Sequence, residues 1–312
     1  MSVFLGIDTS NYTTSLSLYD TASNQVEMEK RLLPVKPGQC GLRQSDAVFL
    51  HVKQLGELAE TLFARTGLTP QGIGYSAFPR RVDGSYMPCF LVGEMAAQLL
   101  ASAFSLPVYS FSHQEGHIAA ALYSAGALDW LDTEFYAFHV SGGTTEGLLV
   151  SPGNPGLQVQ RICATRDLHA GQVIDRVGVM LGLDFPCGPA LEQLAAGCTQ
   201  KIKVRPVLKD CDCCLSGIEN QCQALMQKGE SREYIARFCL ESVLAAVAGM
   251  TRRLLEQYGP KSLVYAGGVM SNRRIRSALE KEFHGLFAQP QFSSDNSAGI
   301  AVLAARQHSK EG

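Results

Sequence analysis

The chain has 312 residues with a formal net charge of -2, and 46% of its residues are hydrophobic. This length allows two domains with separate cores, and the near-neutral charge excludes a general polyanion-binding protein, so any contact with nucleic acid must be local. The N-terminus turns polar too soon for a signal peptide, and no apolar run approaches the roughly 20 residues of a membrane span. The sequence therefore predicts a soluble, cytoplasmic protein without a membrane partner.

The first predicted element is a β-hairpin. Residues 3–8 are mostly apolar, a hydroxyl-rich turn follows, and a second strand is predicted over 14–19. The turn contains Asp8, Thr9, Ser10 and Asn11. Backbone N–H groups and hydroxyls in such a turn can contact a phosphate, so residues 8–11 are a candidate phosphate loop.

Helices and strands alternate in the next hundred residues. Apolar spacing predicts helices over 45–65, which stops at Gly67, and over 90–104. Short strands are predicted over 73–77 and 107–111, and the second leads into an apolar helix that Ser112 opens and Ala125-Gly126 ends.

Two histidines lie at the start of this helix. His113 and His117 are four residues apart, which places both imidazoles on one face with their Cβ atoms about 5–6 Å apart. This spacing suits a shared divalent metal. It also fits a polar first turn in which the histidines cap backbone groups. Glu115 lies on a different face and is not automatically a third ligand.

The initial hairpin pattern recurs about 130 residues later. A strand is predicted over 135–140, then the turn Ser141-Gly142-Gly143-Thr144-Thr145, then a strand over 147–150. An internal repeat of this kind predicts two similar α/β lobes. We expect the first lobe to span 1–130 and the second 131–295, with a final helix over 296–309 packing back on the first.

The second lobe continues with a strand over 158–165 and a helix over 167–183 that carries Asp175. A Gly/Pro-rich turn over 182–189 cannot continue that helix. The remaining predicted elements are a helix over 231–258 stopped by Gly259-Pro260, a strand over 262–266, and helices over 272–283 and 297–308.

Three turns that follow strands carry hydroxyl groups or glycines: residues 8–11, Gly142-Gly143 and Gly267-Gly268. Each turn alone is compatible with an ordinary tight turn. Together they favour a bound nucleotide, with phosphates at the first two and the base or ribose at the third. Asp175 could accept hydrogen bonds from ribose hydroxyls or be an ordinary surface carboxylate. Asp295 precedes the last helix and is either its N-cap or a carboxylate ligand that completes a metal site with the two histidines.

The ten cysteines are expected to be reduced. The densest group, Cys211, Cys213 and Cys214 with Cys222 beyond, lacks a paired C-x-x-C arrangement. Buried thiols are favoured here over a structural zinc site.

Successive blocks of the chain resemble the TsaD/YgjD family, which supplies the catalytic subunit of tRNA threonylcarbamoyladenosine synthesis. The blocks are residues 6–10, 112–117, 140–144, Asp175, 182–189, 266–274 and 294–296. They follow the family order and cover nearly the whole chain. The resemblance implies an actin/Hsp70-like (ASKHA) α/β fold, with two RNase-H-like lobes around a nucleotide cleft.

The resemblance also implies roles for individual residues. His113, His117 and Asp295 would bind a divalent metal, with Fe or Zn the expected ions, although these ligands also accept Mn. Val140, Ser141, Gly142, Gly143 and Thr144 would lie along the nucleotide phosphates. Asp175 and Gly188 would contact the ribose and adenosine, and Asn272 the adenine, with Gly267 and Gly268 nearby. The ligand would be ATP or threonylcarbamoyl-AMP, and the partners would be tRNA and the other subunits of the threonylcarbamoyl pathway.

The chain departs from the family pattern at several positions. Phe78-Pro79-Arg80-Arg81 replaces a Gly-Pro-Gly-Leu block, Thr144 replaces a histidine, and Leu168 and Gln172 replace two carboxylates. The predicted activity is transfer of a threonylcarbamoyl group from threonylcarbamoyl-AMP to N6 of adenosine 37 in tRNA. The alternative is a divergent, catalytically weak paralogue that binds nucleotide as a regulator or scaffold. A metalloprotease is disfavoured because Glu115 does not have the position of the Glu in H-E-x-x-H.

Overall fold

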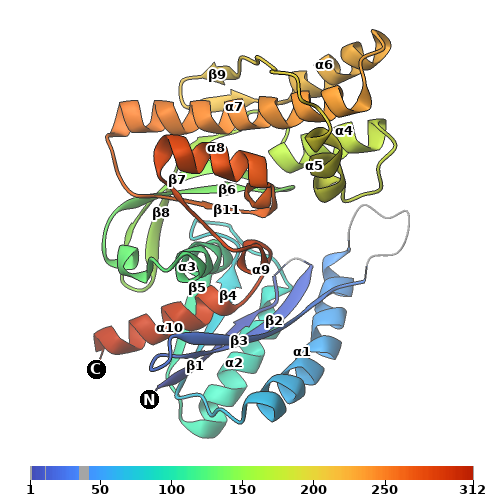
Figure 1. The fold of residues 1–312 in the computed structure, drawn as a ribbon. Coiled ribbons are helices and arrows are strands. Elements are labelled where there is room, and N and C mark those ends of the chain that lie inside the picture. The colour runs from blue at the N-terminus through green and yellow to red at the C-terminus, as the bar shows by residue number, and fades with distance from the viewer. Residues whose placement is uncertain (1, 11, 35–41, 312) are drawn as a thin grey trace. The chain divides into compact units, whose positions relative to one another are not determined.

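The computed structural model describes residues 2–10, 12–34 and 42–311. The chain divides into two compact units (Figure 1). Unit 1 comprises Met1–Asp132, Pro152–Gln158 and Gln291–Gly312, and unit 2 comprises Thr133–Ser151 and Val159–Pro290. Unlike the predicted lobes, unit 1 includes 152–158 and 291–295. Hydrogen bonds link both segments to the rest of unit 1: the N–H of Leu157 donates to Glu115, and Lys30 donates to the carbonyl of Gln291.

Unit 1 contains a five-stranded sheet in the order β3-β2-β1-β4-β5. The strands are β1 (Val3–Asp8), β2 (Thr13–Asp20), β3 (Gln25–Leu32), β4 (Gly72–Phe78) and β5 (Val108–Ser112). The first three pair antiparallel, whereas β4 and β5 run parallel to β1. The parallel strands are possible because helices connect them.

Helices of unit 1 cover both faces of this sheet. They are α1 (Gln44–Thr66), α2 (Phe90–Phe104), α3 (His113–Ala125), the 3-10 turn η1 (Leu128–Asp132), α9 (Pro290–Ser293, whose first residue belongs to unit 2) and α10 (Ala298–Glu311). Leu5 and Ile7 of β1 face the core formed with α1 and α2. Because side chains alternate along a strand, Gly6 points to the opposite face, where α10 lies.

Unit 2 repeats the sheet order of unit 1. Its sheet has the order β12-β11-β6-β7-β8. Strands β6, β7 and β8 correspond to β1, β2 and β3 of unit 1, and β11 and β12 correspond to β4 and β5. The strands are β6 (Phe135–Val140), β7 (Thr145–Pro152), β8 (Leu157–Ala164), β11 (Leu263–Ala266) and β12 (Leu286–Phe287). β6 pairs antiparallel with β7 and parallel with β11, as β1 does with β2 and β4. The predicted duplication is therefore confirmed.

The helices of unit 2 pack around a large apolar core under the central helix α7. They are α4 (Ala170–Met180), α5 (Gly188–Ala196), α6 (Ser216–Gln227), α7 (Arg232–Tyr258), η2 (Gly268–Ser271) and α8 (Arg273–Phe283). A separate antiparallel pair, β9 (Val207–Lys209) and β10 (Asp212–Cys214), contacts α7 as well. The predicted 231–258 helix matches α7, whose N-cap Ser231 accepts from the N–H of Tyr234 at 3.2 Å.

Several elements were not predicted, among them β3, α5, α6 and β9. In β3 the apolar residues Val26 and Met28 alternate with charged ones and pack against a small cluster, but the alternation is short and no residue of the strand is fully buried. The predicted 167–183 helix is shorter than expected. It begins at Ala170, and its end at Met180 is followed by Gly182 with φ of 74°.

One helix is an exception to the expectation that no apolar run approaches the length of a membrane span. Among the described residues, α7 is long and apolar enough to cross a membrane by length and composition alone, but 67% of its most apolar window is buried inside the protein. Its apolar residues are therefore accounted for by the core of unit 2.

Candidate metal centre and nucleotide pocket

Helix α3 presents both candidate histidines from a firmly capped first turn. Ser112 is the N-cap, and its Oγ accepts from the N–H of Glu115 at 3.2 Å. Glu115 in turn accepts from the N–H of Ser112 at 2.8 Å. This capping box fixes the direction in which the chain enters the helix. It therefore also fixes the backbone position of His113, the first residue of α3.

The structure brings His113, His117 and Asp295 together. The two Nε2 atoms lie 2.9 Å apart. Oδ1 of Asp295 lies 3.2 Å from Nε2 of His117 and 3.5 Å from Nε2 of His113. Among the described residues, this is the one group of three or more histidine, cysteine or acidic side chains with the spacing of metal ligands. In the sequence, His113 and Asp295 are 182 positions apart, and only the fold shows that the three ligand atoms converge.

The charges of this cluster depend strongly on one another. Burial lowers the pKa of His113, but the carboxylates of Asp8 and Asp295 outweigh burial and raise the pKa to about 10. Burial opposes ionisation of Asp295, yet the two imidazoles hold the pKa of Asp295 well below its usual value. Two facing imidazole nitrogens therefore need a proton or another cation between them.

The three donor atoms fit a divalent metal. Ligands at about 2.1 Å from an ion, with angles of about 90–109° between them, are separated by about 3.0–3.4 Å. The observed separations of 2.9, 3.2 and 3.5 Å are close to that range. Two histidines and one carboxylate leave further coordination positions open, which is typical of catalytic Zn and non-haem Fe sites.

Asp8 contacts a histidine of this centre. Its Oδ2 lies 2.8 Å from Nδ1 of His113, and it also accepts from Ser76 and from the N–H of Ser10. A carboxylate on Nδ1 directs the Nε2 lone pair of the histidine toward the ion. Thr9 is also buried and bonded to backbone groups of α2 and its N-cap. These contacts do not support the predicted phosphate role of Asp8 and Thr9.

The other two residues of the predicted phosphate loop differ from each other. Ser10 is buried, with its Oγ 3.5 Å from Nε2 of His113, so it borders the metal centre. Asn11 lies outside the described residues.

We expect Asp8→Asn to lower the affinity for the metal by about 10–100-fold, because the amide no longer provides a charged acceptor for Nδ1 of His113. Isothermal titration with Zn²⁺ would measure the change, and the exposed Asp46→Asn on α1 is the control. An affinity equal to that of the unaltered protein would show that Asp8 does not support the ligand.

Asp295 does not cap the last helix. Its neighbour Asn296 accepts from the N–H of Ala298 at 3.1 Å and donates to the carbonyls of Phe292 and Ser294. Lys30 of β3 donates to Gln291 and Ser294 of the same segment. The cap and the ligand are thus separate residues, and the Asp295 carboxylate remains directed at the histidines.

Glu115 is fully committed elsewhere. It is buried and accepts from Ser112 and from the N–H of Leu157 at 2.8 Å, and it pairs with Arg81 at 3.2 Å. A carboxylate held in this way is not available as the general base of a metalloprotease, so the structure also disfavours that function.

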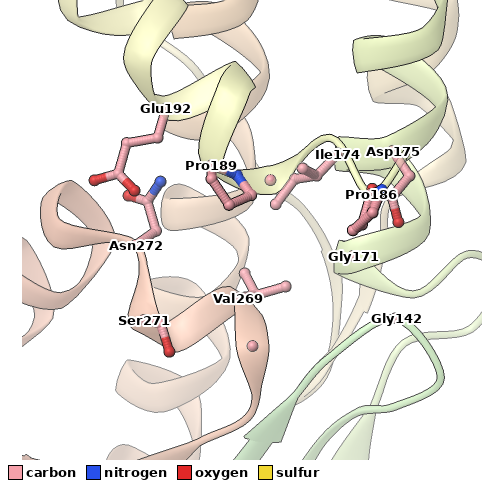
Figure 2. A pocket seen from close by; sticks show the side chains of 12 residues that line it. Gly142, Gly171, Ile174, Asp175, Pro186, Pro189, Glu192, Val269, Ser271 and Asn272 are labelled. Atoms are coloured by element: carbon pink, nitrogen blue, oxygen red, sulfur yellow. The ribbon is translucent and has the colours of Figure 1, made fainter. Parts of the chain in front are cut away.

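A second candidate site lies within unit 2. Figure 2 shows a pocket of about 380 Å³ whose walls come mainly from the starts of helices. Its lining residues are Gly142, Gly171, Ile174, Asp175, Pro186, Gly188, Pro189, Glu192, Gly268, Val269, Ser271 and Asn272. Gly171, Gly188 and Gly268 belong to the first turns of α4, α5 and η2. Helix N-termini favour anionic groups, so this arrangement suits a nucleotide phosphate.

Five of the residues predicted for the nucleotide line this pocket: Gly142, Asp175, Gly188, Gly268 and Asn272. Ser141, Gly143 and Thr144 lie in the turn beside it, where the N–H of Ser141 donates to the carbonyl of Thr144. Val140 is a buried core residue, so its side chain cannot line the pocket. Gly267 has a φ of 100°, and an added Cβ would lie 2.3 Å from the carbonyl oxygen of Val140. The backbone at Gly267, just after β11, therefore passes close to the end of β6 at Val140.

The polar side chains of the pocket also hold the backbone. Asp175 accepts from the N–H of Cys187 at 2.8 Å, and Glu192 accepts from the N–H of Arg273 at the same distance. Asn272 caps α8 through its Oδ1. In Figure 2, Asn272 and Glu192 lie side by side at one end of the pocket. The sequence analysis did not predict Glu192 as a pocket residue, because it did not predict helix α5. A helix that starts near Pro189 would have placed Glu192 one turn into it.

We expect Gly268→Leu to weaken nucleotide binding at least about tenfold without lowering stability, because a Cβ here meets no atom within 4 Å and the side chain would fill the pocket. Titration with AMP and a thermal melt would measure both quantities. Gly56→Leu on α1, where space is equally open, is the control. Unchanged AMP affinity would contradict this location of the nucleotide.

Among the described residues, the cysteine cluster lacks the spacing of metal ligands. Cys211, Cys213 and Cys222 are buried, and burial raises the pKa of the Cys213 thiol to about 12. A metal ligand must be a thiolate, so the observed burial favours neutral thiols.

The positions that depart from the family pattern have structural partners. Arg81 pairs with Glu115, Leu168 packs against the core of unit 2, and Gln172 accepts from the N–H of His169 at the start of α4. Thr144 accepts through its carbonyl in the turn after β6.

Comparison with known proteins connects these sites to a family. Residues 37–302 match the profile of TsaD, described as tRNA N6-adenosine threonylcarbamoyltransferase. This chain belongs to the TsaD family. A relative from Thermus thermophilus, named tRNA N6-adenosine threonylcarbamoyltransferase, is 31% identical across 98% of this chain and 93% of its own length. The chain is thus a member of a transferase family, as the sequence motifs predicted.

A relative from Methanothermobacter thermautotrophicus, named a probable bifunctional tRNA threonylcarbamoyladenosine biosynthesis protein, is 27% identical across 96% of this chain and 54% of its own length.

Solved structures confirm the expected fold. Full-length HypF in a phosphate- and nucleotide-bound form has a TM-score of 0.61 and 14% identity, covering 99% of this chain and 46% of that one. Component A of (R)-2-hydroxyglutaryl-CoA dehydratase from Acidaminococcus fermentans has a TM-score of 0.56 and 16% identity, covering 99% and 100% of the chains. The fold is therefore of the ASKHA type.

Proposed function

We propose that this protein transfers a threonylcarbamoyl group from threonylcarbamoyl-AMP to N6 of adenosine 37 in tRNA. The family match across residues 37–302 supports the reaction class. The convergence of His113, His117 and Asp295 supports the need for a divalent metal, Fe or Zn. The partners in this proposal are tRNA and the other proteins of the threonylcarbamoyl pathway.

In the proposed reaction, the N6 amine attacks the carbamoyl carbon. A C–N bond forms, the C–O bond to the adenylate phosphate breaks, and AMP leaves while the amine loses a proton. When bound, the metal would supply Lewis acidity. His113, His117 and Asp295 would hold it, and Asp8 would keep the His113 ring oriented.

The unit 2 pocket supports adenylate as the donor. The helix starts at Gly171, Gly188 and Gly268 suit its phosphate, and the carboxylates of Asp175 and Glu192 can accept hydrogen bonds from ribose hydroxyls or the adenine amine. These residues would bind and orient the donor, which is the contribution expected when the leaving group is already activated.

Transfer of label is the direct test. The protein, its pathway partners and radiolabelled threonylcarbamoyl-AMP are incubated with tRNA, and digested nucleosides are separated by mass. We expect modified adenosine that depends on added metal, and no product with tRNA in which adenosine 37 is replaced by guanosine. Binding of metal and AMP without transfer would instead support the regulatory paralogue, which no observation on the described residues favours.

A further inference from the structure

Unit 2 carries a row of exposed cations that neither candidate site uses. From residue 201 to 209, odd-numbered residues are exposed and even-numbered residues are half-buried. Lys201, Lys203 and Arg205 are the first three exposed members, and we call them the basic strip. Alternation with a period of two places their side chains on one side of the chain, about 6–7 Å apart along it.

Packing of the even-numbered residues fixes this orientation. Pro206 and Leu208 lie against Gly249 of α7, where an added Cβ would approach Leu208 to 2.7 Å. The strip leads directly into β9, which pairs with β10 and contacts α7 (Figure 1). Because the even side faces the protein, the odd side must face solvent.

The charges of the strip are not balanced locally. Within the part of the chain that the structure describes, none of the three cations has an ion-pair or hydrogen-bond partner. By contrast, two other exposed arginines of unit 2 have acidic partners: Arg176 pairs with Glu219, and Arg252 with Glu282. Lys209 continues the row but lies opposite Asp212 and beside Asp210, so the run of cations without acidic neighbours ends at Arg205.

We propose that the basic strip contacts the phosphate backbone of the tRNA substrate. The proposal rests on the proposed function for the choice of tRNA as the ligand. A chain with a net charge of -2 attracts a polyanion only where cations gather without counter-charges. A single row of evenly spaced cations suits one line of phosphates. Such contacts position an RNA without reading its sequence.

The test compares three variants by direct binding of labelled tRNA over a range of salt concentrations. The strip variant combines Lys201→Gln, Lys203→Gln and Arg205→Gln. Loss of three phosphate contacts lowers the salt slope by about 2 and the affinity about 100-fold at 0.1 M salt. The control combines Lys53→Gln, Lys228→Gln and Lys281→Gln, three exposed lysines on other elements, and should bind like the unaltered protein. The variant with Lys201→Arg and Lys203→Arg should also retain binding.

Binding is measured without transfer, so failure of the proposed reaction does not affect the outcome. Thermal melts and AMP affinity show whether the strip variant is folded. Equal losses in the strip variant and the control would overturn the proposal, as would unaltered binding by the strip variant. Strip-dependent binding to phosphatidylserine vesicles with no strip-dependent binding to tRNA would overturn it in favour of a membrane surface.

Discussion

Asp295→Ala is expected to lower metal affinity more than 100-fold and to remove metal-dependent transfer. The change deletes one of three ligand atoms and leaves two imidazoles, whereas loss of an outer partner such as Asp8 costs about 10–100-fold. The start of α10 should remain intact, because Asn296 and not Asp295 caps it. The metal-free protein should nevertheless lose stability at neutral pH, because the lowered pKa of Asp295 means that its carboxylate pairs favourably with the two imidazoles. Metal content after dialysis, measured by mass spectrometry, and label transfer to tRNA would test both effects.

The control for this change is Asp46→Ala, which removes an exposed carboxylate on α1 of the same unit. AMP binding should be equal in both variants, since the pocket residues belong to unit 2. Retained metal with lost transfer would give Asp295 a role in the reaction other than ligation. Retained metal and retained transfer would remove the candidate metal centre altogether.

Gly299→Ala is expected to destabilise unit 1 by about 3 kcal/mol, the upper end of ordinary overpacking. A Cβ at this position would lie 1.9 Å from the carbonyl oxygen of Gly116 and 2.6 Å from the nitrogen of Ala120. Both are backbone atoms of α3, so the two helices must move apart. Since α3 carries the histidines and Asp295 precedes α10, metal affinity should fall with stability. Chemical denaturation and zinc titration would measure the two losses.

Gly56→Ala is the matched control, because an added Cβ in the middle of α1 meets nothing within 4 Å. That change should raise stability by about 0.5–1 kcal/mol through better helix propensity. Equal stability of Gly299→Ala and the unaltered protein would show that the helices can separate without cost. Lost stability with unaltered metal affinity would show that their contact does not position the ligands.

The sequence predicted the sites unevenly. Four-residue spacing placed His113 and His117 on one helical face, and motif resemblance added Asp295. Asp8 was assigned to a phosphate turn because its neighbours are hydroxyl residues, whereas the fold directs it to Nδ1 of His113. Ordering along the chain cannot reveal such a contact between residues 105 positions apart. The side chain of Val140 is buried, so its predicted place along the phosphates stays a prediction that concerns its backbone alone.

The sequence by itself determined the duplicated β-hairpins, the helix that presents two histidines, the glycine turns and the family. These features depend on local periodicity, capping and turn chemistry, which neighbouring residues encode. The tertiary structure decided which distant groups meet. Helix α10 approaches the sheet closely at Gly6 and Gly74 and approaches helix α3 closely at Gly116, where an added Cβ would come within 3 Å of α10 atoms. This close approach places Asp295, just before α10, beside the histidines. This close packing needs a glycine on each of three separate elements, β1, β4 and α3. It therefore cannot be predicted from any single stretch of the sequence.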